Sequence, residues 1–241
     1  MGRFDTTRWS LVLRARGDAA DARAALEILC RTYRPPVLAY VRSHVHARDS
    51  AEDLTQAFFT RFIERAWHAG ADPERGRFRT FLLTALKRFL IDADAEAHAL
   101  KRGGNIRFEA LDDDVADALD GAEAPDEVFE REWARVVLAA ALQRLRAEAE
   151  DAGKLVLFER LGEFLTEPPD EADYARVAAE LNLRRNTLAV AVHRLRHRLR
   201  DLVREELAET TSCRADMDAE LRALREALGP ASQRAPARQP V

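Results

Sequence analysis

Apolar residues recur along most of the chain three and four positions apart, which is the spacing of helices that bury one face. This pattern predicts an all-α fold. The expected helices, in chain order, are a short one capped by Thr6 or Thr7, and then 18–33, 37–45, 50–67, one around 78–90, 127–149, 155–165, 173–181, 185–204 and 217–228. Pro35 and Pro36 separate the second helix from the third, because proline lacks the N–H that a helix interior needs.

Residues 173–204 contain two of these helices with a short break between them. The first has one apolar face, formed by Tyr174, Val177, Ala178 and Leu181. Asn182 interrupts the pattern, and asparagine tolerates the left-handed conformation that ends many helices. The second helix begins near Arg185 or Asn186 and has a single apolar stripe, formed by Leu188, Val192, Leu195, Leu199 and Leu202. These features predict a helix-turn-helix.

Arginine is concentrated on the second helix of this pair. Its basic residues are Arg184, Arg185, Arg194, Arg196, Arg198, Arg200 and Arg204, and Asp201 is the acidic residue among them. With Leu188 facing the core, the residues that point the other way are Asn186, Val190, His193, Arg194 and His197. We interpret this segment as a DNA-recognition helix. The alternative is that the arginines form the solvated face of an ordinary helix.

Helix 50–67 has a polar face that differs from the rest of the domain. Its apolar face is formed by Leu54, Phe58, Phe59, Phe62, Ile63 and Ala66, with Thr55 among them. The opposite face has Asp53, Gln56, Ala57, Thr60 and Glu64. This acidic and amide-bearing strip is suited to contact with another protein.

The helix around 78–90 combines aromatic and basic residues. Its apolar stripe consists of Phe78, Phe81, Leu82, Ala85, Leu86, Phe89 and Leu90, and the cations around it are Arg75, Arg77, Arg79, Lys87 and Arg88. Single-stranded nucleic acids are bound by such combinations, through base stacking and phosphate neutralisation. The alternative for the phenylalanines is a plain core stripe, so the cations are the better evidence for nucleic-acid binding.

Charge is unevenly distributed along the 241 residues, whose formal net charge is −4. Residues 112–127 contain eight acidic residues and no Lys or Arg, which is typical of a flexible linker. The chain is therefore expected to divide into a first helical domain (1–107), an acidic linker (108–126), a second helical domain (127–208) and a C-terminal short helix with a disordered tail (209–241). A protein that coats DNA without regard to sequence is usually strongly basic. The slightly acidic balance favours a protein that needs a partner to hold it on DNA.

Composition argues against several other classes. No apolar run approaches the roughly 20 residues of a membrane span, and the N-terminus lacks the apolar stretch of a signal peptide, so we expect a cytoplasmic protein without membrane contact. Cys30 and Cys213 lie far apart without metal-like spacing, and Cys30 is expected to be a buried thiol. His193 and His197 lack the third ligand of a zinc site. We therefore expect that the protein is not an enzyme and that it binds no cofactor and no metal ion.

The motifs in their order resemble those of bacterial extracytoplasmic-function (ECF) sigma factors of the sigma-70 family, over about residues 8–104 and 129–207. AEDLTQAFFTRF resembles the helix that docks on the β′ clamp of RNA polymerase, GRFRTFLLTALKRFLID the −10 melting and recognition segment, and YARVAAELNLRRNTLAVAVHRLRHRLR the −35 helix-turn-helix. The resemblance implies a promoter-specificity subunit that binds promoter DNA and core polymerase, through the β′ clamp helices and the β flap.

By this resemblance, specific residues acquire expected roles. Core polymerase would be bound by Glu52, Asp53, Gln56 and Thr60; the −10 strand by Arg77, Arg79, Lys87 and Arg88; and −35 DNA by Arg184, Arg185, Asn186, Thr187, His193, Arg194 and Arg196. The chain departs from the family pattern at Ala57, where an acid commonly follows the glutamine. It departs again at residues 189–191, where polar or basic residues are common: the side chains here are Ala, Val and Ala, which can contact thymine methyl groups but supply no hydrogen bonds to base edges.

Within this family the chain is most similar to a subgroup associated with Ser/Thr protein kinases rather than with membrane anti-sigma factors, on the segments TTRWSLVL, DPERGRFRTFLL, AVHRLRHRLR and VREELAETT. Phosphorylation of Thr60, one turn from Ala57, would add roughly −1.5 to −2 charge and replace the missing acid. The alternatives are an unmodified surface threonine and modification of Thr55, whose inward direction would first require the helix to loosen.

Two other functions compete with the sigma-factor interpretation. A free-standing helix-turn-helix regulator would bind duplex DNA unaided, usually as a dimer, but would leave the basic and aromatic segment of the first domain unexplained. A helical interaction protein would use the arginine-rich helix to bind a protein. Specific initiation by core polymerase separates the first function from both.

Overall fold

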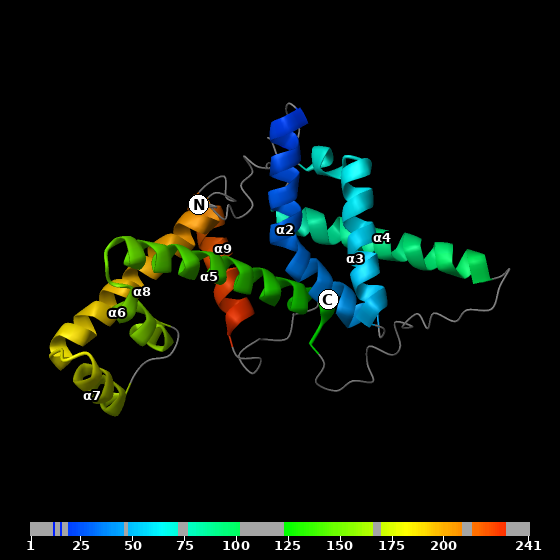
Figure 1. Ribbon diagram of the computed structural model, residues 1–241. Coiled ribbons are helices and arrows are strands. Elements are labelled where there is room, and N and C mark those ends of the chain that lie inside the picture. The colour runs from blue at the N-terminus through cyan, green and yellow to red at the C-terminus, as the bar shows by residue number, and fades with distance from the viewer. Residues whose placement is uncertain are drawn as a thin grey trace. The chain divides into compact units, whose positions relative to one another are not determined.

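The computed structural model describes residues 12, 15, 19–45, 48–71, 77–101, 123–165, 170–208 and 214–229. All regular structure within these residues is helical, which confirms the predicted all-α class. Their elements are α2 (Ala19–His44), α3 (Arg48–Glu64), η1 (Trp67–Gly70), α4 (Phe78–Lys101), α5 (Pro125–Asp151), α6 (Leu155–Leu161), η4 (Glu163–Leu165), α7 (Glu171–Glu180), α8 (Arg185–Ala208) and α9 (Arg214–Leu228) (Figure 1). The helix expected after Thr6 or Thr7, most of the acidic linker and the tail after 229 lie outside the described residues.

The chain divides into two compact units, residues 1–136 with 209–241 and residues 137–208. The boundary falls inside α5 rather than at the acidic segment. The first part of α5 packs in the first unit, where Phe129 is fully buried and its ring lies 6.5 Å from that of Tyr40 in α2. The C-terminal helix α9 also belongs to the first unit.

The break expected at Pro35 and Pro36 is wrong, because α2 continues through both prolines. Two prolines remove two backbone N–H donors, at a cost of about 3 kcal/mol or more for each interior position. The apolar stripe nevertheless continues at helical spacing across them, since Leu29, Tyr33, Val37 and Val41 are all buried. Packing of this continuous stripe offsets the lost hydrogen bonds.

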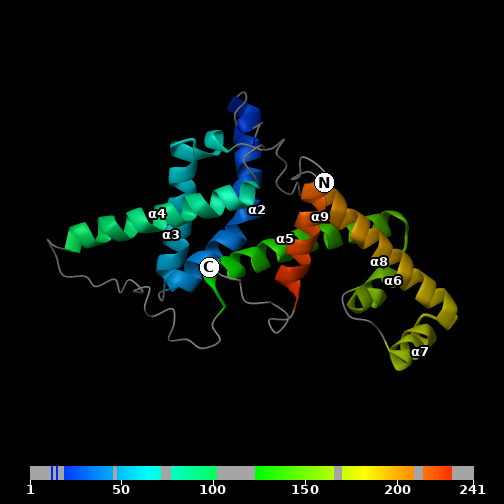
Figure 2. The ribbon, with the colours of Figure 1, turned by 180° about the vertical axis from the view of Figure 1, so that it is seen from behind.

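The core of the first unit is formed where α4 crosses α2 and α3, which lie side by side (Figures 1 and 2). Phe58 of α3 is fully buried, and its ring centroid lies 5.6 Å from that of Phe89 in α4. Near the start of α4, the ring centroid of Phe78 lies 5.3 Å from that of Tyr33 in α2. Phe78 and Phe89 are therefore core residues, and neither ring is exposed for stacking on a nucleic-acid base. Cys30 of α2 is half-buried, and burial raises the pKa of its thiol to about 11.

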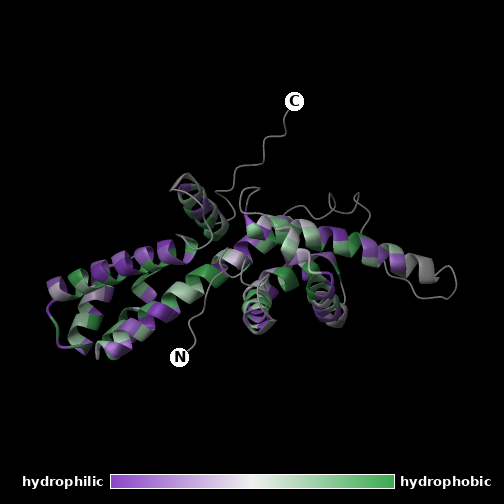
Figure 3. Ribbon diagram, turned by 90° about the horizontal axis from the view of Figure 1, so that it is seen from above, coloured by the Kyte–Doolittle hydropathy of each residue, from purple (hydrophilic) through white to green (hydrophobic). Residues whose placement is uncertain are grey.

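The second unit has a small core between α6, η4, α7 and α8. Its buried members are Leu161, Phe164, Val177, Ala178, Leu188 and Val192. A capping box between Asp170 and Asp173 begins α7. Asn182 ends the turn after it in the left-handed conformation, at φ 51°, as the sequence predicts. Apolar (green) and polar (purple) residues occur together along each helix, as expected of helices that bury one face (Figure 3).

No described helix combines the length and apolar composition that a membrane span requires. Within the same residues, no cluster of three or more His, Cys, Asp or Glu side chains is arranged to hold a metal ion.

Candidate functional site

The polar face of α3 forms a shallow hollow of about 470 Å³. Its lining residues are Asp53, Gln56, Ala57, Thr60, Arg61 and Glu64. The sequence therefore identified this face, with Arg61 as the addition. The Arg61 guanidinium lies over the Phe89 ring at 5.2 Å and within 3.4 Å of Glu96, so its charge is partly engaged by α4. The hollow consequently presents Asp53, Gln56, Thr60 and Glu64 to solvent.

Glu52 has a different environment from Asp53. Its carboxylate pairs with Arg34 and, at 2.9 Å, with Arg42, both on α2. These side chains are about half exposed, so each pair stabilises the fold by less than about 1 kcal/mol. A basic residue of a partner protein could therefore replace Arg34 and Arg42 at little cost in stability. In the free chain, however, the Glu52 carboxylate is paired with these two arginines.

The two threonines of α3 differ in accessibility. Thr60 is exposed at the edge of the hollow, whereas Thr55 is fully buried and its hydroxyl oxygen has no hydrogen-bond partner within the described structure. The predicted inward direction of Thr55 is confirmed. An enzyme that modifies the helix could reach Thr60 directly and could reach Thr55 only after local opening.

The basic residues at the start of α4 are already engaged by acids. Arg79 is only 4% exposed; its Nε lies 2.9 Å from Glu130 of α5, and its guanidinium also pairs with Glu220 of α9. The guanidinium carbon lies 3.9 Å from the centre of the Trp133 ring. Burial alone would lower the pKa of Arg79, but the charges of Glu130 and Glu220 outweigh it and raise the pKa above its ordinary value. Arg79 therefore stays charged, and contact with DNA would require these pairs to break.

The other cations predicted for the −10 strand, Arg77 just before α4 and Lys87 and Arg88 within it, are more accessible. Arg77 pairs with the same Glu220 at 2.8 Å, and its side chain is 37% exposed. Lys87 lies 2.7 Å from Asp126 at the start of α5. Arg88 is exposed, and within the described residues it makes no ion pair.

The start of α8 presents the residues predicted for duplex DNA. Arg184, Arg185, Asn186, Thr187, His193 and Arg194 are all exposed, with Leu188 buried on the opposite side. Arg185 pairs with Glu171 at 3.2 Å. Arg196 differs from the others, because its Nε donates to the Phe164 carbonyl at 2.7 Å and so joins α8 to η4. The exposed fraction of Val190 is 49%, so the small apolar positions of this helix also face solvent.

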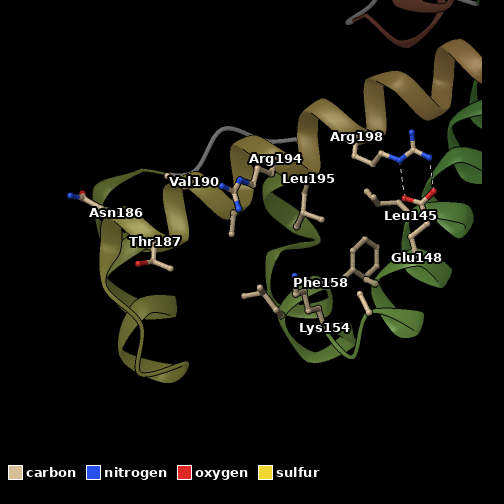
Figure 4. Close-up of a pocket in the computed structure, with 14 residues that line it drawn as sticks. Leu145, Glu148, Lys154, Phe158, Asn186, Thr187, Val190, Arg194, Leu195 and Arg198 are labelled. Carbon is tan, nitrogen blue, oxygen red and sulfur yellow. Dashed lines mark hydrogen bonds and ion pairs between the residues drawn. The ribbon is translucent and has the colours of Figure 1, made fainter.

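A groove of about 730 Å³ lies between α5, α6 and α8 of the second unit, and sequence patterns did not indicate it. Leu145, Phe158 and Leu195 point toward one another in it, and Asn186, Thr187, Val190 and Arg194 lie along its α8 side (Figure 4). At one end Arg198 forms two hydrogen bonds with Glu148, at 2.6 and 2.8 Å. These bonds lower the pKa of Glu148, although its partial burial opposes the shift. The groove is assembled from helices distant in sequence, which is why periodicity alone could not reveal it.

The family comparison finds a match in the segment that contains the second part of α2, all of α3 and most of α4. Residues 29–95 match the family model for sigma-70 region 2. The match spans 67 of the 241 residues and shows a likeness to sigma-70 region 2 within that segment. No curated protein and no solved structure matches the chain.

The matched segment includes the α3 hollow and the α4 cations, apart from residues that follow Ala95. The α7–α8 segment and α9 lie outside it. The roles of individual residues thus stay predictions, and the geometry supplies the means to test them.

Proposed function

We propose that this chain is an RNA polymerase sigma factor of the ECF type, with a region 2-like first domain and a region 4-like second domain, that directs initiation at promoters with −10 and −35 elements. The observation with the most weight is the sigma-70 region 2 match, because it covers the one polar helix face and the one basic helix that the sequence had indicated in the first domain. Such a subunit acts in the cytoplasm, where core polymerase and the chromosome are located.

In this proposal the α3 hollow binds the β′ clamp helices. Asp53 and Gln56 supply the acidic and amide contacts, and Thr60 lies beside them. Replacing exposed Asp53 with lysine is expected to weaken binding to core polymerase at least tenfold, because it removes an attraction and adds a repulsion to a charge-complementary interface. The matched control is Glu27→Lys on α2, which makes the same change of charge at another exposed acid. Equal losses in the two variants would contradict the assignment of this face.

The second unit binds −35 DNA through the exposed start of α8. The support is the concentration of uncommitted polar and basic side chains there, Arg184, Asn186, Thr187, His193 and Arg194, opposite a fully buried Leu188. Arg196 contributes by holding α8 against η4. Arg194→Ala should reduce the salt dependence of duplex binding by about one phosphate contact. Arg200→Ala, which removes an exposed arginine farther along α8, is the control, and an equal effect there would indicate non-specific charge attraction only.

The groove of the second unit is the proposed contact for the β flap. Its apolar floor at Leu145, Phe158 and Leu195 is suited to the apolar face of a helix, and Lys154 can meet an acidic residue at the rim. Leu195→Asp is expected to abolish activation at promoters that depend on a −35 element while leaving binding through the first unit measurable. Retained activity would remove the groove from the interface.

Control by a Ser/Thr kinase is proposed at Thr60. The support is its exposure beside Asp53, Gln56 and Ala57, where a phosphate would add roughly −1.5 to −2 charge to an already acidic face. Treatment with a Ser/Thr kinase is expected to raise the affinity for core polymerase in the wild-type chain and in Thr80→Ala, an exposed threonine on α4, but not in Thr60→Ala. A full response in Thr60→Ala would reject the site. If kinase treatment leaves the affinity of the wild-type chain for core polymerase unchanged and an anti-sigma factor lowers it, control by an anti-sigma factor is favoured instead.

A further inference from the structure

The buried face of α9 contains a carboxylate in place of an apolar residue. Glu220, Leu224 and Ala227 share one side of the helix, at the i, i+4 and i+7 positions, and their exposed fractions are 1%, 7% and 9%. Burying a carboxylate is unfavourable unless cations pair with it. Here each oxygen has its own partner, because Oε1 accepts from Arg77 at 2.8 Å and Oε2 accepts from Arg79.

The two arginines lie at the start of α4, Arg77 just before the helix and Arg79 in its first turn, within the segment that the sequence predicts to bind the −10 strand. Guanidinium groups bind carboxylates and phosphates with the same donor geometry. A guanidinium whose donors are held by Glu220 cannot at the same time donate to a DNA phosphate in that direction. Docked α9 and a DNA strand are therefore alternative ligands of Arg77 and Arg79.

We propose that α9 is an intramolecular cover of the −10 strand surface, in which the Glu220 carboxylate occupies the phosphate position and must leave before single-stranded DNA can bind. This inference rests on the proposed function, since it regulates the same α4 surface. The free chain is accordingly held in a state of low affinity for DNA, and undocking of α9 exposes the arginines.

The contact is suited to exchange rather than to permanent closure. The buried apolar residues of α9 are Leu224 and Ala227, which offer little apolar area. The Glu220 carboxylate is therefore the main specific contact that α9 makes. A buried ion pair adds little net stability, because the loss of hydration nearly cancels the attraction. A phosphate that takes the place of Glu220 provides the arginines with an equivalent partner. Arg77 is more exposed than Arg79, and Arg79 is also held by Glu130, so Arg77 is the arginine expected to change partner first.

Glu220→Gln in the full chain is the principal test. It keeps the shape of the side chain and removes the charge that holds the arginines, whereas Glu226→Gln makes the same charge change on the exposed side of α9. The probe is a fluorescein-labelled, A/T-rich single-stranded oligonucleotide of roughly ten nucleotides, within the site size of such domains. Fluorescence anisotropy gives the Kd at several salt concentrations.

The expected result is that Glu220→Gln binds the oligonucleotide at least threefold more tightly than Glu226→Gln, which matches the wild type. The slope of log K against log salt should steepen by about 0.7, for the one phosphate contact on a single strand that Arg77 gains, because Arg79 keeps its pairing with Glu130. Adding Arg77→Gln to Glu220→Gln should remove most of the gain. Equal affinity and slope in Glu220→Gln and Glu226→Gln would overturn the proposal.

A measurement on the unaltered chain guards against a variant that fails to fold. Hydrogen exchange of the amides of residues 214–228 should accelerate when the oligonucleotide is added at saturation, because α9 undocks. Unchanged protection at full DNA occupancy would contradict the cover. Binding to core polymerase, measured in parallel, separates this inference from the proposed function: normal core binding without any α9 effect rejects the cover alone, and a chain that does not bind core polymerase rejects the proposed function.

Discussion

Replacing Arg79 with methionine tests how far the first unit depends on a buried guanidinium. Methionine retains much of the length and apolar bulk of the side chain but loses the charge and the hydrogen bonds to Glu130 and Glu220. Removing one member of a buried ion pair typically costs about 3–5 kcal/mol, because the other charge stays buried without compensation.

Two features of the site place the expected loss at the lower end of that range. Arg77 still pairs with Glu220, and the Glu130 side chain is 32% exposed, so water can solvate it. Loss of the contact with the Trp133 ring adds about 0.5–2 kcal/mol. We therefore expect Arg79→Met to lower the free energy of unfolding of the first unit by about 3.5–5 kcal/mol. Coupling in a double-mutant cycle with Glu220→Gln should be about 1–3 kcal/mol, since the two side chains are in contact.

Urea unfolding followed by tryptophan fluorescence measures this loss selectively. Trp67 and Trp133 lie in the first unit, and residues 137–208 contain no tryptophan, so the emission does not report the second unit. Arg88→Met is the matched control, because Arg88 is exposed on the same helix and its replacement should change stability by less than about 0.5 kcal/mol. If Arg79→Met unfolds at the same urea concentration as Arg88→Met, the buried pairing of Arg79 is refuted.

Three further predictions concern the stability of each unit. Thr55→Val should raise the free energy of unfolding of the first unit by about 1 kcal/mol, because it removes a buried hydroxyl without a partner, and a fall of that size in a urea titration would contradict this. Leu188→Ala should cost the second unit about 2–5 kcal/mol as followed by circular dichroism, whereas Leu183→Ala, at a partly exposed position, should cost far less; equal losses would argue against the α7–α8 core. The pKa of Glu148 is lowered in the folded chain, so its contribution to stability is present above its ordinary pKa of about 4.3 and is lost as pH falls toward the lower folded value. Arg198→Met should flatten the acid limb of the second unit's stability curve, and an unchanged limb would remove that pair as its cause.

Local signals account for the parts of the fold that the sequence predicted well. The spacing of Tyr174, Val177 and Leu188, together with the helix-ending tendency of Asn182, is determined by residues within one or two turns, and the α7–α8 segment agrees with the prediction. The break at Pro35 and Pro36 was wrong because a tertiary effect, packing of a continuous stripe, outweighed a local one.

Long-range charge pairing is the part that sequence reasoning could not predict. Arg79 and Glu220 are separated by 141 positions, and each looks like an ordinary exposed charge in its own helical pattern. The same holds for the groove, whose Leu145, Phe158 and Leu195 come from three helices. Only the three-dimensional arrangement distinguishes an accessible cation such as Arg88 from a buried one such as Arg79.

Run-off transcription tests the central claim most directly. The purified chain is mixed with core RNA polymerase and a library of genomic promoter fragments, with and without a Ser/Thr kinase, and transcripts are mapped to their start sites. The sigma-factor account predicts transcripts from a discrete set of promoters that share −10 and −35 elements, all dependent on the added chain. An absence of core binding and of transcripts under both conditions, together with unaided binding to duplex DNA, would contradict it and favour an autonomous regulator.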